Sequence, residues 1–505
     1  MIIPRLSKIT DRTKMLFCLL LVLIVSYFTY FSGYNKPSTV IYDERYNIVH
    51  AERYLQRTLY FDVNPPIAKL FIALGEKIFA PNKNLDLSEH LNRGYVFDDI
   101  TPGFSFIGVR FFPTLFAFLN ALLFFLILYK LSKNNFLSLM FTSLYLFENS
   151  SIVHFRTAMI DSTMIFFSFL AILYFLYLYE KKKRKAFLNY FILGCLTALA
   201  AFTKLVGFIC LLLFVFLLLK EINSKSLKNL RSKILCGFKA SLSYLFAVFI
   251  IGFLTYYLHI VICTNIVLEE DNRDLPSKIG ASKEYVKLIE EKDLANPLKL
   301  YVPMRDYFNY ITAPQELLPE LNDDINSTPL LWPIGIKNVI YSVFSDSDIG
   351  KDKNSYLKFQ GNAVNWLMGF ISIIVSLGLI VSRFIFKVKV SDKKTFNYIL
   401  IFTSLYVGFM GAVTFISLKR PLYIHTYLLP LFFSFIIFFL VFNYFFQKNI
   451  IKKSKTLMLS IFLLVFLIFY VFCYTSPLSY AKPITYLECE KTKMVDYWED
   501  DCVSE

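Results

Sequence analysis

Long apolar runs, each close to the length of a membrane-crossing helix, alternate with short polar segments along most of the 505-residue chain. A helix needs about 20 consecutive apolar residues to cross the hydrocarbon core of a bilayer. The runs are continuous, whereas the strands of a membrane β-barrel alternate apolar and polar residues, so a barrel is excluded. We therefore expect an all-α polytopic membrane protein with about eleven spans. They are expected near residues 15–34, 107–129, 136–154, 158–179, 186–203, 206–219, 236–262, 363–385, 396–418, 421–446 and 456–475.

Two of the apolar runs are too long for one crossing and must turn. The run 186–219 would reach about 50 Å as a single helix, which exceeds the bilayer core. Lys204 lies near its middle, so we predict a hairpin of two short spans that turns there. The run 136–179 is expected to turn within its polar patch, residues 148–161.

The distribution of basic residues predicts which ends of the spans face the cytoplasm. Short cytoplasmic loops of membrane proteins are enriched in Lys and Arg. If the basic N-terminus (residues 1–14) is cytoplasmic, eleven crossings place every Lys/Arg-rich loop on that side. These loops are 130–135, 181–185, 220–233, 387–394 and 447–455. The bias also explains the net charge of +15, so no nucleic-acid partner is expected.

The same topology divides the chain into membrane regions and lumenal segments. An N-terminal transmembrane region (15–262) contains the first lumenal loop (35–106), and a C-terminal transmembrane region covers 363–475. A longer lumenal loop (263–362) separates the two regions, and the tail (476–505) is also lumenal. No cysteine–histidine spacing typical of a metal site occurs, so no metal is expected. Three cysteines lie in polar segments, where an oxidising lumen allows pairing: Cys263, Cys489 and Cys502.

Ten ionisable residues near span ends are not explained by the cytoplasmic bias, and the predicted topology puts all of them on the non-cytoplasmic side. Charges near a membrane are costly and indicate a function. Arg and Lys stabilise the charge on a departing phosphate, and one carboxylate accepts the proton of an incoming hydroxyl. The set therefore favours sugar transfer from a lipid phosphate. Its members are Asp43, Glu44, Arg110, Glu148, His154, Arg156, Asp161, Lys204, Arg420 and His425.

Motifs in the same order along the chain resemble one enzyme family. The likeness is to the protein O-mannosyltransferases, dolichyl-phosphate-mannose-dependent enzymes of the GT-C class. The first-loop motifs are Asp43-Glu44 and Phe61-Asp62-Val63-Asn64-Pro65-Pro66-Ile67-Ala68-Lys69. The later ones are Arg110, Glu148-Asn149 with Arg156 and Asp161 at the family's spacing, Thr203-Lys204-Leu205-Val206-Gly207, Leu331-Trp332-Pro333, the segments 361–366 and 420–430, and the tail from Ser476 with Cys489 and Trp498.

The chain also departs from the family pattern. Asn64 stands where the family has His before Pro-Pro, Ala68 replaces a Gly, and Thr426 replaces the second His of a His-His pair. The loop 263–362 is too short for the β-trefoil MIR domain that eukaryotic members carry there, so we expect none. Acceptor selection by such a domain is not assumed.

The resemblance implies a role for each site residue. Asp43 is expected to be the base that activates the acceptor hydroxyl, and Glu44 is expected to orient either Asp43 or the acceptor. The expected ligands of the donor phosphate are Arg110, Lys204, Arg420 and His425. A second group belongs either to the donor and acceptor site or to structural ion pairs: Asn64, Lys69, Glu148, Arg156 and Asp161. Lys69 alternatively snorkels to the interface, and His50, His90 and His259 are interpreted as structural.

The expected reaction moves mannose from dolichyl-phosphate-mannose to Ser/Thr hydroxyls with inversion, without a metal or other cofactor. The expected setting is the endoplasmic reticulum membrane, or the plasma membrane of a bacterial source, with a possible homo- or heterodimer of family members. The rival hypotheses are an aminoarabinose-type transferase acting on a lipid acceptor, a transporter, and a non-catalytic partner subunit. A transporter predicts inverted repeats, which the sequence does not show.

Overall fold

A computed structural model of the chain describes residues 11–87, 100–181, 186–223, 229–266, 281–294, 296, 298–312, 327–336, 339–344, 353–418, 422–452, 454–492 and 502. The chain forms two compact units, each built from separate segments. The sheet unit comprises Met1–Ser32, Phe118–His154 and Asn322–Glu505. The loop unit comprises Gly33–Ala117 and Phe155–Leu321, and it contains the first lumenal loop.

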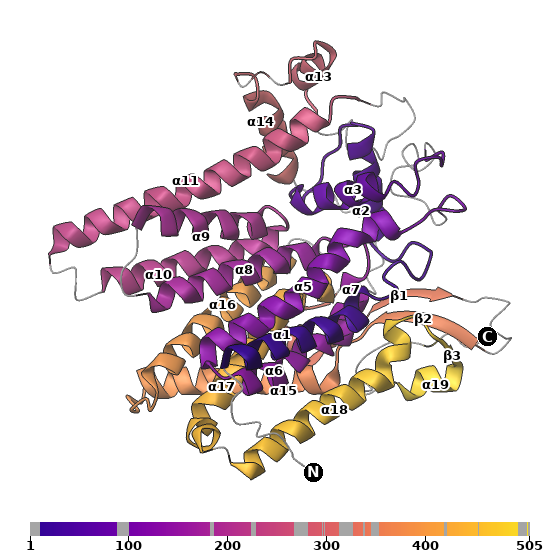
Figure 1. Ribbon diagram of the computed structural model, residues 1–505. Helices are drawn as coiled ribbons and strands as arrows, with labels where there is room; N and C mark the ends of the chain where they lie inside the picture. Colours follow the sequence, from indigo (N-terminus) through magenta and orange to yellow (C-terminus); the bar gives the residue numbers. More distant parts are fainter. Residues whose placement is uncertain are drawn as a thin grey trace. The chain divides into compact units, whose positions relative to one another are not determined.

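The polytopic helical class is confirmed (Figure 1). Within the described residues, nine helices are long and apolar enough to cross a membrane. The third expected span is a pair of helices bent by 62° at residues 147–148, and the fifth is a shorter apolar helix, Phe187–Ala201. The nine are Asp11–Phe31, Ile107–Ser132, Asp161–Glu180, Leu205–Ile222, Leu230–Ile262, Ala363–Phe384, Lys393–Ser417, Ile424–Ile451 and Lys455–Ser479.

The loop unit combines spans with short helices of the lumenal loops. Helix α11 packs along α9, and α8 packs along the other side of α9, while the two loop helices α2 and α3 pack on each other. Its helices are α2 (Glu44–Leu55), α3 (Ile67–Phe79), the start of α5 (Ile107–Ser132), α8 (Asp161–Glu180), α9 (Ala186–Ala201), η2 (Leu205–Leu211), α10 (Leu212–Ile222), α11 (Leu230–Ile262), α13 (Lys283–Glu290) and α14 (Tyr301–Thr312).

The turn expected at Lys204 is confirmed. Helix α9 ends at Ala201, and the chain re-enters as the 3₁₀ turn η2 before α10. Gly207 lies against the end of α9, where an added Cβ would meet the Ala200 carbonyl oxygen at 2.4 Å. This close approach requires glycine, because any larger residue would push the two arms of the hairpin apart.

Helix α11 corrects one expected boundary. It begins at Leu230, not near residue 236, and runs for 33 residues to Ile262. At 1.5 Å per residue it is about 50 Å long, so it extends beyond a hydrocarbon core of about 30 Å. The first turns of the helix contain charged residues such as Arg231 and Lys233. They are compatible with the helix because this end can extend out of the hydrocarbon core.

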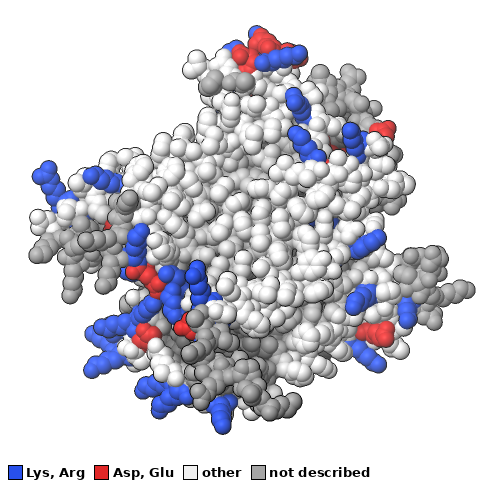
Figure 2. Space-filling view, in the orientation of Figure 1, with Lys and Arg blue, Asp and Glu red and all other residues white. Residues whose placement is uncertain are grey.

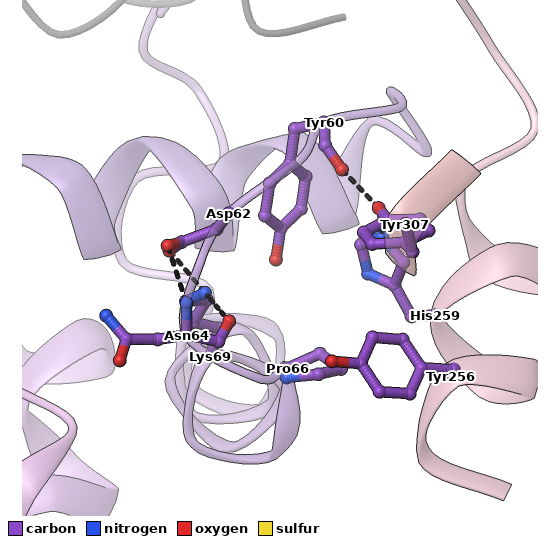
Figure 3. Close-up of a pocket in the computed structure, with 8 residues that line it drawn as sticks. All are labelled: Tyr60, Asp62, Asn64, Pro66, Lys69, Tyr256, His259 and Tyr307. Atoms are coloured by element: carbon purple, nitrogen blue, oxygen red, sulfur yellow. Dashed lines mark hydrogen bonds and ion pairs between the residues drawn. The ribbon is translucent and has the colours of Figure 1, made fainter. Parts of the chain in front are cut away.

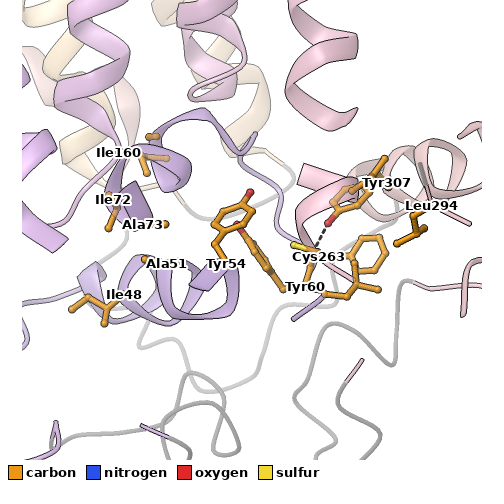
Figure 4. Close-up of a cluster of buried hydrophobic side chains, with 14 of the residues drawn as sticks. Ile48, Ala51, Tyr54, Tyr60, Ile72, Ala73, Ile160, Cys263, Leu294 and Tyr307 are labelled. Atoms are coloured by element: carbon orange, nitrogen blue, oxygen red, sulfur yellow. Dashed lines mark hydrogen bonds between the residues drawn. The ribbon is translucent and has the colours of Figure 1, made fainter. Parts of the chain in front are cut away.

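A cluster of buried apolar side chains holds together the part of the loop unit that contains α2, α3 and α14. Figure 4 shows Ile48, Ala51 and Tyr54 of α2 facing Ile72 and Ala73 of α3. The cluster continues to Cys263 at the end of α11 and to Tyr307 of α14. The first loop is therefore a packed subdomain, and α2 carries its residues in fixed positions.

The sheet unit adds a feature that hydropathy did not predict. Strands β1 (Val339–Phe344), β2 (Lys353–Phe359) and β3 (Pro483–Thr485) form an antiparallel sheet in the order β1-β2-β3. Beside it, a disulfide joins Cys489 to Cys502. The unit's helices are α1 (Asp11–Ser26), η1 (Tyr27–Phe31), α6 (Asn135–Leu146), α7 (Asn149–Phe155), η4 (Pro329–Ile334), α15 (Ala363–Phe384), α16 (Lys393–Ser417), η5 (Ile424–Tyr427), α17 (Leu428–Ile451), α18 (Lys455–Ser479) and α19 (Tyr486–Lys491), with the rest of α5.

The surfaces of the spans are apolar. In the face shown in Figure 2, Lys and Arg gather in patches, and the wide surfaces between the patches carry uncharged side chains. On α11, Phe238, Leu245 and Phe249 are each more than 60% exposed. Large exposed apolar side chains in a helix of this length are what a lipid-facing surface requires.

Candidate active site

Asp43 lies at the N-terminal end of α2, in a constrained turn. Tyr42 before it has φ +49°, a left-handed conformation that is rare for an aromatic residue. Asp43 itself is half-buried, and its carboxylate has no hydrogen-bond or ion-pair partner among the described residues. Strained backbone at a polar, unpaired side chain is a common feature of functional sites.

Glu44, the next residue, has the opposite environment. Its side chain is fully buried, and both oxygens accept hydrogen bonds from the Arg110 side chain on α5. The backbone N–H of Ile41 donates to one oxygen at 2.8 Å, and that of Ala158 donates to the other at 2.8 Å. Glu44 therefore fixes the turn that carries Asp43, as expected of an orienting residue.

The guanidinium of Arg110 likewise makes most of its hydrogen bonds within the protein. Besides Glu44, its guanidinium donates to the carbonyl oxygens of Pro37 and Thr39, each at 2.7 Å, and it lies 4.0 Å from the centre of the Phe106 ring. Four of its five N–H donors are thus used inside the protein. This geometry favours a structural cation that joins α5 to the first loop over a ligand of the donor phosphate.

Lys204 and Asp161 form a second ion pair near Asp43. The Lys204 ammonium lies 2.8 Å and 3.0 Å from the two Asp161 oxygens. Asp161 begins α8 and Lys204 precedes η2, so the pair connects two turns of the loop unit. Arg156, expected at the same site, donates to the Gly33 carbonyl oxygen at 2.9 Å.

The surroundings of Asp43 suit a general base. Burial raises the pKa of its carboxyl to about 6, Arg45 and Lys204 lower it, and Asp161 raises it. A base works best when its pKa lies near the operating pH. At neutral pH most of the Asp43 carboxylates are ionised and still bind a proton readily.

A small pocket, with a cavity volume of about 10 Å³, lies elsewhere in the loop unit, around the Pro-Pro motif (Figure 3). Asp62 pairs with the Lys69 ammonium and lies 3.5 Å from His50. Lys69 also donates to the Asn64 carbonyl oxygen at 2.7 Å. Lys69 is buried, and burial lowers its pKa. The alternative in which Lys69 snorkels is therefore wrong, because its charge is held inside by Asp62.

The far wall of this pocket consists of residues that the motifs did not identify. His259 of α11 shares hydrogen bonds with Tyr54 and Tyr307, and Tyr307 donates to the Tyr60 carbonyl oxygen. Tyr256 completes the wall. His259 lies in an apolar run without a neighbouring motif, so no local signal could have placed it here. Its structural interpretation agrees with its buried, fully bonded ring.

The remaining expected residues belong to the sheet unit. Glu148, at the α6–α7 bend, is fully buried and accepts hydrogen bonds at 2.8–3.0 Å from Ser150, Asn362, Asn365 and Trp366. These contacts make it a structural link between the bend and the start of α15.

The His154 ring, also in the sheet unit, stacks on the His425 ring at 5.0 Å between centres and shares a hydrogen bond with Tyr341. Arg420 and His90 lie outside the described residues. The loop unit thus contains Asp43, Glu44, Arg110 and Lys204, whereas His425 lies in the other unit.

Comparison with known families matches most of the chain. Residues 20–264 match the model described as dolichyl-phosphate-mannose-protein mannosyltransferase. Residues 308–498 match the C-terminal four-span region of protein O-mannosyltransferases. The first match includes the whole constellation around Asp43, and the second includes the sheet and helices α15 to α18.

Individual relatives agree with this assignment. Dolichyl-phosphate-mannose–protein mannosyltransferase 4 of Schizosaccharomyces pombe is 28% identical over 164 residues, which is 32% of this chain and 20% of that protein. Protein O-mannosyl-transferase 1 of Danio rerio is 29% identical over 174 residues, 34% of this chain and 23% of that protein. The aligned segments thus span about a fifth of these relatives' length.

The fold also has a solved counterpart. A chain in the Saccharomyces cerevisiae Pmt1–Pmt2 complex bound to the sugar donor superposes with a TM-score of 0.78 at 15% identity, covering 98% of this chain and 94% of that one. At that identity the likeness concerns the fold alone. The two family matches, which together cover most of the chain, identify it as a member of the protein O-mannosyltransferase family.

Proposed function

We propose that this protein transfers mannose from dolichyl-phosphate-mannose to Ser or Thr hydroxyls of proteins, with inversion at the anomeric carbon and without a metal or other cofactor. The family membership supports the reaction class. Asp43 is the proposed base. The observation that carries this assignment is the contrast between its unpaired, half-buried carboxylate and the fully bonded Glu44 beside it.

The proposed step is a single displacement. The acceptor oxygen forms a bond to the anomeric carbon while the bond to the phosphate oxygen breaks, and its electron pair leaves with the phosphate. The hydroxyl proton moves to Asp43. Because the phosphate departs without a proton, one carboxylate is sufficient, unlike the paired acids of glycoside hydrolases.

The donor phosphate needs cations, and the proposal retains Lys204, Arg420 and His425 for this purpose. Lys204 keeps 12% of its side chain exposed beside Asp161, so a phosphate can approach its ammonium. For Arg420 and His425 the support is the family motif in residues 420–430. For Arg110 we propose an orienting function instead, supported by its hydrogen bonds to Glu44, Pro37 and Thr39.

We also propose an endoplasmic reticulum location and pairing with a second family member. The Cys489–Cys502 disulfide supports an oxidising compartment for the tail. The fold counterpart is described as a complex of two family members, which supports a dimer. Acceptor polypeptides and the lipid donor complete the list of proposed partners.

The decisive experiment compares wild type with Asp43→Asn, using labelled lipid donor and either a Ser/Thr peptide or a lipid as acceptor. We expect transfer to the peptide, reduced about 10²–10⁴-fold by the substitution. Glu291→Gln, which changes an exposed carboxylate in the longer lumenal loop, serves as the matched control. Equal activity of folded Asp43→Asn, or transfer to the lipid alone, would contradict the proposal.

A further inference from the structure

Three of the cations that the motifs single out in the loop unit already have anionic partners, and a fourth, Arg156, donates to the Gly33 carbonyl oxygen. Arg110 pairs with Glu44, Lys204 with Asp161 and Lys69 with Asp62. An incoming phosphate would have to compete with these carboxylates for each cation. Beside the partly accessible Lys204, the site therefore requires a cation among the described residues whose hydrogen-bonding capacity is uncommitted.

Arg45, which the family motifs do not include, fits that requirement. It is the second residue of α2, two positions after Asp43. Its Nε is buried without a hydrogen-bond partner, and its guanidinium makes no hydrogen bond or ion pair within the described ranges. The central carbon of the guanidinium lies 5.6 Å from the centre of the Tyr46 ring. An arginine with a buried, unsatisfied donor indicates a missing anionic ligand.

The position of Arg45 also suits a phosphate. The first turn of a helix favours anions, because its backbone N–H groups and the helix dipole both point toward them. The guanidinium fork binds two phosphate oxygens at once, with stronger hydrogen bonds than a neutral donor makes. Arg45 lies close enough to Asp43 to lower the pKa of its carboxyl, so both side chains belong to the N-terminal end of α2.

We propose that Arg45 binds the phosphate of the lipid-linked sugar donor, so that a single turn of α2 supplies both the base and a ligand for the leaving group. The inference rests on the proposed function for the identity of the donor. It adds a residue that the family motif does not contain. Arg45 on one side and Lys204 on the other would then share the charge that develops on the phosphate.

The test measures donor and acceptor dependence separately in Arg45→Gln, Arg45→Lys and the control Arg57→Gln. Arg57 is an exposed arginine just beyond the C-terminal end of the same helix. We expect the KM for the donor to rise about tenfold to a hundredfold in Arg45→Gln, with the KM for the peptide unchanged. Arg45→Lys should recover part of this loss, and Arg57→Gln should match wild type.

A purely electrostatic influence on Asp43 gives a different result. Arg45 lowers the pKa of Asp43, so Arg45→Gln would then shift the pH profile upward and leave the donor KM unchanged. That outcome overturns the proposal. So does an equal donor KM in all variants whose thermal unfolding in detergent matches wild type.

Equilibrium binding of labelled donor to purified Asp43→Asn separates this inference from the proposed function. Binding that weakens in Asp43→Asn/Arg45→Gln supports the phosphate contact even if wild type transfers no mannose, as a non-catalytic subunit would behave. Binding that is insensitive to Arg45, alongside active transfer by wild type, rejects the inference and leaves the function standing.

Discussion

Asp43 and Glu148 are carboxyl groups at two breaks in the helical pattern, one in each compact unit, and their surroundings are opposite. Glu148 accepts four hydrogen bonds from the sheet unit, including one from the Trp366 indole and one from a backbone N–H. The Asp43 carboxylate accepts no hydrogen bond from the described part of the chain. Sequence alone treats both as acids near a span end.

The comparison separates structural acids from chemical ones. A buried carboxylate whose oxygens are all satisfied stabilises the fold and has little capacity left for a substrate. An unsatisfied carboxylate costs stability, and such a cost is retained where the group binds or reacts. Glu44 belongs with Glu148 by this criterion, although it adjoins Asp43 in the sequence.

The largest contrast should come from changing the two neighbouring acids in turn. Asp43→Asn is expected to abolish most activity with little change in thermal unfolding, because within the described residues its carboxylate makes no hydrogen bond that the substitution would remove. Glu44→Gln leaves Arg110 buried without a compensating charge, a loss of about 3–5 kcal/mol of stability. Activity per folded molecule and melting temperature in detergent measure the two effects. Similar destabilisation by both variants would contradict the distinction between a chemical Asp43 and a structural Glu44.

Glu148→Gln should be a purely structural change of intermediate size. The new amide group would face the Asn365 side-chain amide, which now donates to Glu148 at 2.9 Å, so two donors would oppose each other. We expect a loss of about 1–3 kcal/mol, with unchanged kcat and KM in the protein that remains folded. A selective fall in kcat would place Glu148 in the chemistry.

The pH dependence of transfer should sharpen the assignment of Asp43. Because the ionised form is the base and its pKa is about 6, kcat/KM should fall as pH drops through 6, by up to about tenfold per unit. Asp161 raises this pKa, so Asp161→Asn should move the acid limb to lower pH. A flat profile between pH 5 and 7 would argue against Asp43.

A smaller effect is expected at Glu52, a buried acid of α2 with no hydrogen-bond partner in the described structure. Burial, with a contribution from Glu76, raises its pKa to about 8. In the unfolded chain, Glu52 loses its proton near pH 4. The stabilisation of the folded state by protonated Glu52 is therefore complete below that pH, and it is lost as the pH rises toward 8. Glu52→Gln should therefore raise the melting temperature at pH 7.5 more than at pH 5. Equal increases in melting temperature at both pH values would show that the raised pKa of Glu52 is not the cause.

Several properties of the protein followed from local pattern. Apolar runs of span length predicted the helical membrane class, and the interruption at Lys204 predicted the α9–α10 hairpin. Both are determined by short-range physics, the length needed to cross a bilayer and the cost of charge inside it. The first-loop motif likewise singled out Asp43 and Glu44, whose roles at a site stay a prediction.

The partners of those charges depended on the tertiary structure. Arg110 lies 66 residues from Glu44 and Lys204 lies 43 from Asp161, so no spacing rule connects them. The same holds for His259, which reaches the Pro-Pro pocket from a distant span, and for the strands of the small sheet. Sequence determined which groups are costly to bury, because hydropathy and charge are properties of single residues. Only packing decided which of these groups find a hydrogen-bond partner, because a hydrogen bond depends on the positions of two residues.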